Sequence, residues 1–104
     1  MTETEFARLA ADTLAKIETG LERSGADLDF ELGGGVLEVE FADGAKLIVN
    51  AHGAAQEIWV AAKSGGFHFR FDDGHWRDTR SGEDLKAALT RLVNLHLGAP
   101  IELA

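Results

Sequence analysis

The sequence predicts an α+β protein, a two-layer sandwich in which N- and C-terminal helices pack on one face of a roughly six-stranded antiparallel sheet. An amphipathic helical pattern stands at each end of the chain, and short segments of alternating apolar and polar residues fill the middle. Glycine-containing turns separate these segments, as in hairpin-connected strands. A sheet that alternates in this way has one apolar face, which two terminal helices can cover while the other face meets water.

The first helix is predicted at residues 2–24. Thr2 and Glu5 can form a capping box, in which each side chain satisfies one backbone N–H group at the helix start. Gly25 is placed to end the helix. Residues at steps of three and four form one core-facing stripe, which contains Phe6, Leu9, Ala10, Thr13, Ile17 and Leu21.

Six short strands follow from period-two alternation. They span residues 27–32, 36–41, 46–50, 58–60 and 67–71, with a last strand around Trp76. Asp43-Gly44 predicts a tight hairpin between the second strand and the third.

The second helix is predicted to begin at Ser81, with Ser81 and Asp84 as a capping box. Gly98 and Pro100 are expected to end it. Its apolar stripe is Leu85, Ala88, Leu89, Leu92 and Leu95.

Length and composition bound the class of protein. The 104 residues predict a single domain over residues 1–104, and 45% hydrophobic with 27% charged residues are globular proportions. The chain has no cysteine, which excludes a disulfide framework, thiolate metal sites and thiol catalysis. We expect a cytoplasmic protein without membrane contact, because neither a secretory signal nor an apolar run of about 18 residues is visible.

Negative charge is concentrated in the first part of the chain. The formal net charge is −8; residues 1–43 hold eleven acidic and three basic residues, whereas residues 44–104 hold seven of each. Such a field attracts cations and basic partners and repels nucleic acid. We therefore expect no nucleic-acid partner.

Five of these acids can form an acidic ridge. Glu18 and Glu22 lie one helical turn apart, and Asp27, Asp29 and Glu31 share one face of the next strand. If that strand is the sheet edge beside the first helix, the five carboxylates line up and offer hard oxygen ligands to Fe²⁺, Fe³⁺, Mn²⁺, Ca²⁺ or Mg²⁺. The alternative is a solvated charged face that keeps an edge strand from pairing.

The alternation also assigns the water-facing side of the sheet. Trp59 is a large apolar residue on this water-facing side, because its neighbours Ile58 and Val60 point inward. Either a loop or a cross-strand pair covers Trp59, or it is an aromatic anchor for a protein partner. The predicted open face contains Glu38, Glu40, Lys46, Ile48, Asn50, Glu57, Trp59, Ala61, His68 and Arg70.

No catalytic template fits the sequence, and we predict no enzyme. The glycines at 33–35 stand between strands and not before a helix, unlike a phosphate-binding loop. The serines lie at helix ends or turns without the setting of a nucleophile. The four histidines lie on separate elements without ligand spacing, and His68 alone shares the open face with Trp59.

Three segments resemble the frataxins. Trp59-Val60-Ala61-Ala62-Lys63-Ser64-Gly65-Gly66-Phe67-His68-Phe69 is similar to the central signature of that family. Trp76-x-Asp78-x-Arg80-Ser81-Gly82-Glu83 and Glu5-Phe6-x-Arg8-Leu9-Ala10 resemble its bacterial branch, CyaY. The resemblance covers nearly the whole chain and implies a frataxin-like sandwich.

The resemblance also implies a function. Frataxins bind Fe²⁺ and Fe³⁺ weakly through an acidic ridge, and they dock on the cysteine desulfurase and its iron–sulfur scaffold protein. Bacterial members are described as iron-responsive regulators, and an iron-donor role has been proposed. By resemblance, the metal-binding residues are Glu18, Glu22, Asp27, Asp29, Glu31 and Glu3; Trp59 falls on the exposed sheet tryptophan implicated in partner contact, and Asn50 on a sheet-surface asparagine typical of the family. The predicted partner-binding residues are Glu18, Glu22, Trp59, Asn50 and His68, the last because it shares the open face with Trp59.

The sequence departs from that pattern at the helix. Relatives often carry adjacent acidic pairs where this chain has Glu18-Thr19 and Glu22-Arg23. Fewer ligands imply weaker iron binding, whereas docking depends on the net field. We expect a monomer without an organic cofactor, with iron-induced oligomers left open. Two alternatives also stay open: an acidic interaction module without a physiological metal, and a weak ferroxidase.

Overall fold

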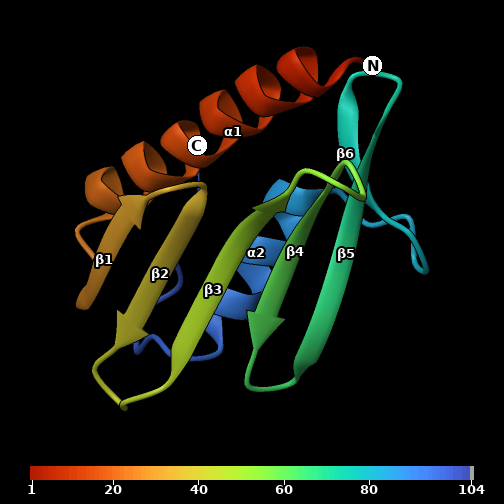
Figure 1. Ribbon diagram of the computed structural model, residues 1–104. Helices are drawn as coiled ribbons and strands as arrows, with labels where there is room; N and C mark the ends of the chain where they lie inside the picture. Colours follow the sequence, from red (N-terminus) through yellow and green to blue (C-terminus); the bar gives the residue numbers. More distant parts are fainter. Residues whose placement is uncertain (104) are drawn as a thin grey trace.

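The chain runs helix, six strands, helix, and the computed structural model describes residues 1–103 of it (Figure 1). The helices are α1 (Glu3–Ser24) and α2 (Leu85–Asn94). The strands are β1 (Leu28–Gly33), β2 (Val36–Phe41), β3 (Lys46–His52), β4 (Glu57–Ala62), β5 (Gly65–Asp72) and β6 (His75–Asp78). They form one antiparallel sheet in sequence order, which confirms the predicted fold class.

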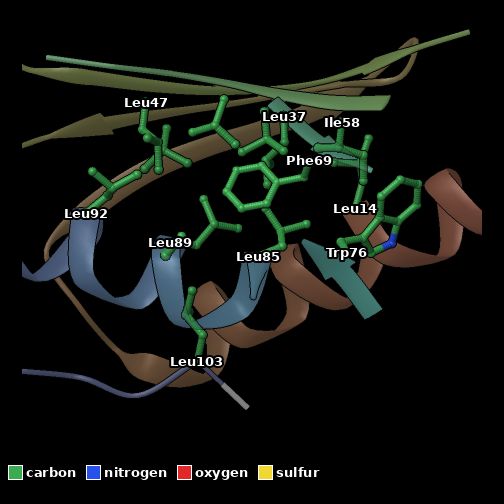
Figure 2. Packing of buried hydrophobic residues seen from close by; sticks show 14 of the residues in the cluster. Leu14, Leu37, Leu47, Ile58, Phe69, Trp76, Leu85, Leu89, Leu92 and Leu103 are labelled. Carbon is green, nitrogen blue, oxygen red and sulfur yellow. The ribbon is translucent and has the colours of Figure 1, made fainter. Parts of the chain in front are cut away.

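Both helices lie on the same side of the sheet. In Figure 1, α2 lies behind the strands and α1 crosses the upper end of the sheet, so the face toward the viewer carries no helix. Figure 2 shows the core side chains between the strands and the two helices. Strands and helices both contribute side chains that are at most 1% exposed, among them Leu37, Val39, Val49, Ile58, Phe69, Ala10, Leu14, Leu89 and Val93.

The ends of α1 follow the predicted capping residues. The Glu5 backbone N–H donates to Thr2 Oγ1 at 3.0 Å, and the Thr2 N–H donates to Glu5 Oε1 at 2.9 Å. The bond from the Thr2 backbone N–H, and then that with the Thr2 side chain, lowers the pKa of the Glu5 carboxyl. At the other end Gly25 has φ 66, a left-handed conformation that a glycine adopts without steric cost.

The predicted start of the second helix is wrong. Asp84, not Ser81, is the N-cap: its carboxylate accepts from the backbone N–H groups of Lys86 and Ala87. Asp78 causes the delay, because its Oδ1 accepts from the N–H groups of Arg80 and Ser81 at 2.7 and 3.2 Å. The backbone therefore turns at residues 79–83 before α2 can begin.

The predicted end of this helix is also wrong. The helix stops at Asn94, and Leu95, which was assigned to the apolar stripe, is 65% exposed. Val93 takes the buried position instead, with 0% exposure. The Asn94 side chain exchanges two hydrogen bonds with the backbone of Ile101, at 2.9 and 3.0 Å, so the chain folds back after the helix. This return places Leu103 in the core at 3% exposure (Figure 2).

Two side-chain contacts join distant parts of the chain. Trp76 Nε1 donates to Thr13 Oγ1 at 3.0 Å and ties β6 to α1. His96, which follows α2, stacks on Phe41 at 4.4 Å between ring centroids, and its Nδ1 lies 2.7 Å from Asp43 Oδ2 in the β2–β3 hairpin. This pair and the backbone N–H of Ala45 lower the pKa of Asp43.

No helix in the described part of the chain is long and apolar enough to cross a lipid bilayer.

The buried C-terminal leucine gives a first prediction. Leu103→Ala is expected to lower the free energy of unfolding by about 2 kcal/mol or more, because it removes a buried side chain from the core cluster. The matched control is Leu95→Ala, whose exposed side chain is expected to matter by less than about 0.5 kcal/mol. Denaturant unfolding measures both, and equal losses in the two variants would contradict the packing role of Leu103.

The Asp43–His96 contact gives a second prediction. A carboxyl whose pKa is lowered by folding adds stability above its unfolded pKa of about 3.9 and loses that contribution as the pH falls through the folded value. Asp43→Asn is therefore expected to lower the melting temperature near neutral pH, with a gap to the parent that closes in acid. Calorimetry of both proteins near neutral pH and in acid tests this prediction. A difference in melting temperature that is the same in both conditions would refute it.

Candidate functional site

The helical part of the acidic ridge stands at the C-terminal half of α1. Glu18 is half-buried and Glu22 is exposed, one turn apart, as predicted. Figure 1 shows this end of α1 beside β1, the edge strand of the sheet. The sequence's premise that the first strand lies at the edge next to the first helix is therefore confirmed.

The strand part of the ridge points the other way. Leu28, Phe30 and Leu32 pack against the core cluster and leave Asp29 and Glu31 exposed on the opposite face of β1. Asp27 is exposed just before the strand. The ridge thus has two tiers on either side of the edge strand, with Glu18 and Glu22 on the helix layer and Asp29 and Glu31 on the open face.

Two further acids join the part of the ridge that lies on the open face. Strand register places Asp29 opposite Glu40 and Glu31 opposite Glu38. The four carboxylates, which we call the acidic hollow, line an open depression of about 530 Å³. Glu38 and Glu40 were predicted on the open face but not in the ridge. Because a hairpin links the first two strands, their alternation could have predicted that these acids lie beside Asp29 and Glu31.

Lys46 partly balances the acidic hollow. Its Nζ lies 3.1 Å from Glu38 Oε1. This bond, with the charges of Glu38 and Glu40, raises the pKa of Lys46, so the ammonium group stays charged at neutral pH. The local charge of the hollow with Lys46 remains negative.

Glu3 does not join the ridge. It stands at the first residue of α1, and a separation of fifteen residue steps puts it about 22 Å from Glu18 along the helix axis. It borders a different depression, with Ala51 and Gly53 at the β3–β4 end of the sheet. Within residues 1–103, no three His, Asp or Glu side chains stand close enough together to hold one metal ion. The ridge is therefore an array of separate carboxylates and not a preformed chelate.

Trp59 is covered by a cross-strand stack. The His52 ring lies against one face of the indole at 3.9 Å and the His68 ring against the other at 4.5 Å, both within 13° of parallel. Asn50 is the register partner of Trp59 on β3. Sequence reasoning left open whether a cross-strand pair covers Trp59, and it does. The reasoning missed His52, whose position at the far end of the same face is fixed only by register.

Beneath this stack lies a buried carboxylate. Glu57 was assigned to the water-facing side but is only 7% exposed, because long side chains from β4 and β5 cover it. Trp59 Nε1 donates to Glu57 Oε1 and an Arg70 guanidinium N–H donates to Oε2, both at 2.8 Å. The bond from Trp59, then that from Arg70, lowers the pKa of Glu57 against the opposing effect of burial. His68 Nδ1 is 3.6 Å from Glu57 Oε1.

The fold and the acidic edge define a class of protein. The structure superimposes on frataxin from Psychromonas ingrahamii with a TM-score of 0.94 and 32% identity, over 100% of this chain and 99% of that one. A trimeric frataxin from Saccharomyces cerevisiae, described as complexed with ferrous iron, aligns with a TM-score of 0.75 and 27% identity over 86% of each chain. The class is therefore the frataxin-type α+β sandwich.

The sequence places the chain within that class. It belongs to the frataxin-like domain family, which it matches over residues 1–99. An iron–sulfur cluster assembly protein CyaY from Dechloromonas aromatica (strain RCB) is 54% identical over 104 residues, covering 99% of each protein. Another CyaY, from Ralstonia nicotianae, is 52% identical over 98 residues, 90% of this chain and 87% of that protein. The predicted bacterial frataxin family is confirmed.

The opposed acids of the hollow give a third prediction. Like charges directly opposite on neighbouring strands destabilise a sheet, and Glu31 on the edge strand faces Glu38. Glu31→Gln is therefore expected to raise the free energy of unfolding by about 0.5 kcal/mol at low salt. Added salt is expected to shrink the gain. Glu102→Gln, an exposed acid outside the sheet, is the matched control. Denaturant unfolding at two salt concentrations measures both; a loss of stability in Glu31→Gln would show that the carboxylates do not repel one another.

Proposed function

We propose that this protein takes part in iron–sulfur cluster assembly in the bacterial cytoplasm as an iron-binding, non-enzymatic regulator. In this proposal it docks on the cysteine desulfurase and its scaffold protein through the acidic ridge. Membership of the frataxin-like family and relatives described as iron–sulfur cluster assembly proteins support the proposal. The observation that carries it is the run of carboxylates from the end of α1 along the edge strand β1.

Iron is a weakly held cargo in this proposal. Carboxylate oxygens are hard ligands suited to Fe²⁺ and Fe³⁺. With no group of three candidate ligands preassembled in residues 1–103, binding at the ridge must recruit water and move side chains. Weak, reversible binding over several ridge positions follows, and the protein acts as a monomer unless iron bridges copies.

Docking uses the same charges over a longer range. Seven of the eleven acids of residues 1–43 lie in the ridge or the hollow, at the β1–β2 edge of the sheet, so the negative field has a defined edge. A field of this kind speeds encounter with a basic groove and fixes the orientation of docking. Iron on Glu18 or Glu22 neutralises part of that field. Iron and the desulfurase therefore compete for the ridge, and this competition is the regulatory coupling.

One observation favours a second candidate. The absence of a preassembled ligand group among residues 1–103 is also what an acidic interaction module without a physiological metal requires. Both candidates bind a basic partner surface. They differ in whether partner binding responds to iron.

Charge reversal on the ridge tests the proposal. The double variant Glu18→Lys/Glu22→Lys is expected to weaken binding to the cysteine desulfurase of the same organism by about tenfold or more in titration calorimetry at low salt. The control Asp12→Lys/Glu102→Lys changes the net charge equally at exposed acids outside the ridge, and it is expected to weaken binding less.

The second arm of this experiment adds Fe²⁺ under anaerobic conditions. Weaker desulfurase binding by the parent protein supports the iron-responsive regulator. Binding that ignores iron supports the metal-free interaction module. If both double variants bind as the parent does, the ridge is not the docking surface.

A further inference from the structure

A small cavity lies on the helix side of the sheet, where α1, α2, β6 and the returning C-terminal segment meet. Its volume is about 200 Å³. Figure 2 shows four of the side chains that line it, Trp76, Leu85, Leu89 and Leu103, on the helix side of the strands. Ile17 on α1 completes the apolar part of the lining. We call this space the interhelix cavity; it shares no residue with the acidic ridge or the acidic hollow.

The polar groups in the wall of the interhelix cavity are already paired. Trp76 Nε1 donates to Thr13 Oγ1 at 3.0 Å, and the Thr13 hydroxyl donates in turn to the Leu9 carbonyl at 2.7 Å. Asp84 Oδ2 accepts two backbone N–H groups of α2, and its Oδ1 lies 3.6 Å from His75 Nδ1. The wall therefore offers a ligand mainly apolar contact.

The border of the interhelix cavity carries positive charge. Lys16 on α1 and Lys86 on α2 both line it, and both are exposed. Neither makes a salt bridge with any group in residues 1–103. The lining contains one acid, Asp84, which caps α2. Two lysines against one acid leave a positive border on a chain of net charge −8, so an anion is the complementary ligand.

The volume and the wall limit what can enter. An apolar cavity of roughly 150 Å³ is large enough for benzene. A cavity of about 200 Å³ thus has room for one aromatic ring with a short chain. Trp76 supplies an aromatic wall, and aromatic rings attract one another edge to face. The ammonium groups at the border are suited to charge-assisted hydrogen bonds with a carboxylate.

We propose that the interhelix cavity binds a small aromatic carboxylate. The ring lies against Trp76 and the leucines, and the carboxylate lies at the border between Lys16 and Lys86. Such a ligand touches both helices and the last strand, which come from opposite ends of the sequence. It binds only the folded protein, so its concentration sets part of the stability of the fold. This site goes beyond the proposed function and does not depend on it.

A titration followed by nuclear magnetic resonance tests the site with a defined probe. Hydrocinnamate is expected to shift the indole N–H signal of Trp76 until the shift saturates. The indole N–H signal of Trp59, on the other side of the sheet, is the internal control and is expected to stay in place. Hydrocinnamate is also expected to raise the melting temperature, because it stabilises only the folded state.

The neutral analogue separates charge pairing from simple filling of an apolar space. Hydrocinnamyl alcohol has the same ring and chain but no charge, and it is expected to bind about threefold more weakly or less tightly still. An alcohol that binds as tightly as the carboxylate would overturn the assignment of an anionic ligand. A shift that does not saturate, or that is equal at Trp59 and Trp76, would overturn the site itself.

Matched variants locate the carboxylate. Lys16→Gln/Lys86→Gln is expected to weaken hydrocinnamate binding by about fivefold and to leave binding of the alcohol unchanged. The control Arg8→Gln/Lys63→Gln removes the same charge at exposed positions outside the cavity lining, and it is expected to change neither. Equal weakening of hydrocinnamate binding by both double variants would show a general effect of net charge and overturn the lysine contacts.

A filling variant locates the ring. Ile17 is half-buried in the lining, so Ile17→Phe puts a larger side chain into the space that the ligand needs. This variant is expected to abolish the Trp76 shift. A folded Ile17→Phe protein that binds hydrocinnamate as the parent does would overturn the position of the ring. The lysine variants change only exposed side chains, so they decide the question if Ile17→Phe does not fold.

Discussion

The structure depends on the burial of one face of a six-stranded sheet by two helices that lie at opposite ends of the chain. Because most apolar residues of the strands point to that face, most polar residues point to the other, and register decides which of them meet. The bond from Trp76 to Thr13 and the stack of His96 on Phe41 fix the helices against the sheet from two sides. Neither helix contributes residues to the open face, yet the sheet that carries this face is stable only because both helices cover its apolar side.

That open face is divided by charge along the sheet. The hollow at β1 and β2 collects acids from two strands, whereas the β3–β6 end carries Arg70 and Arg77 beside the stacked rings of His52, Trp59 and His68. The chain tolerates like charges opposite one another at both ends, Asp29 against Glu40 and Arg70 against Arg77. Such pairs work against the fold, which is the expected mark of residues kept for contacts outside it. A protein that presents both signs on one face can fix the orientation of a partner as well as attract it.

Sequence reasoning reached the element order, the sheet edge and the facing of each strand, because these follow from local periodicity. It could not reach features set by side chains from separate elements. Glu57 is buried by residues that register brings over it, and Trp59 is covered by histidines from the strands on both sides. The second helix was misjudged because Ser81 fits a cap pattern, while the buried Asp78 holds that turn instead. Asp78, one of the residues that carry the family resemblance, therefore supports a turn of the fold.

The chain contains two tryptophans and no tyrosine, and their surroundings differ completely. Trp76 lies in the core at 6% exposure, edge-on to Phe6 and Phe71, whereas Trp59 lies on the open face between two imidazoles. Indole emission depends on what surrounds the ring, so the protein carries two optical reporters without any label. One follows the packing of the helices on the sheet, and the other follows events on the exposed surface. Replacing either with phenylalanine leaves a single emitter, and folding and surface contact can then be observed separately in the same molecule.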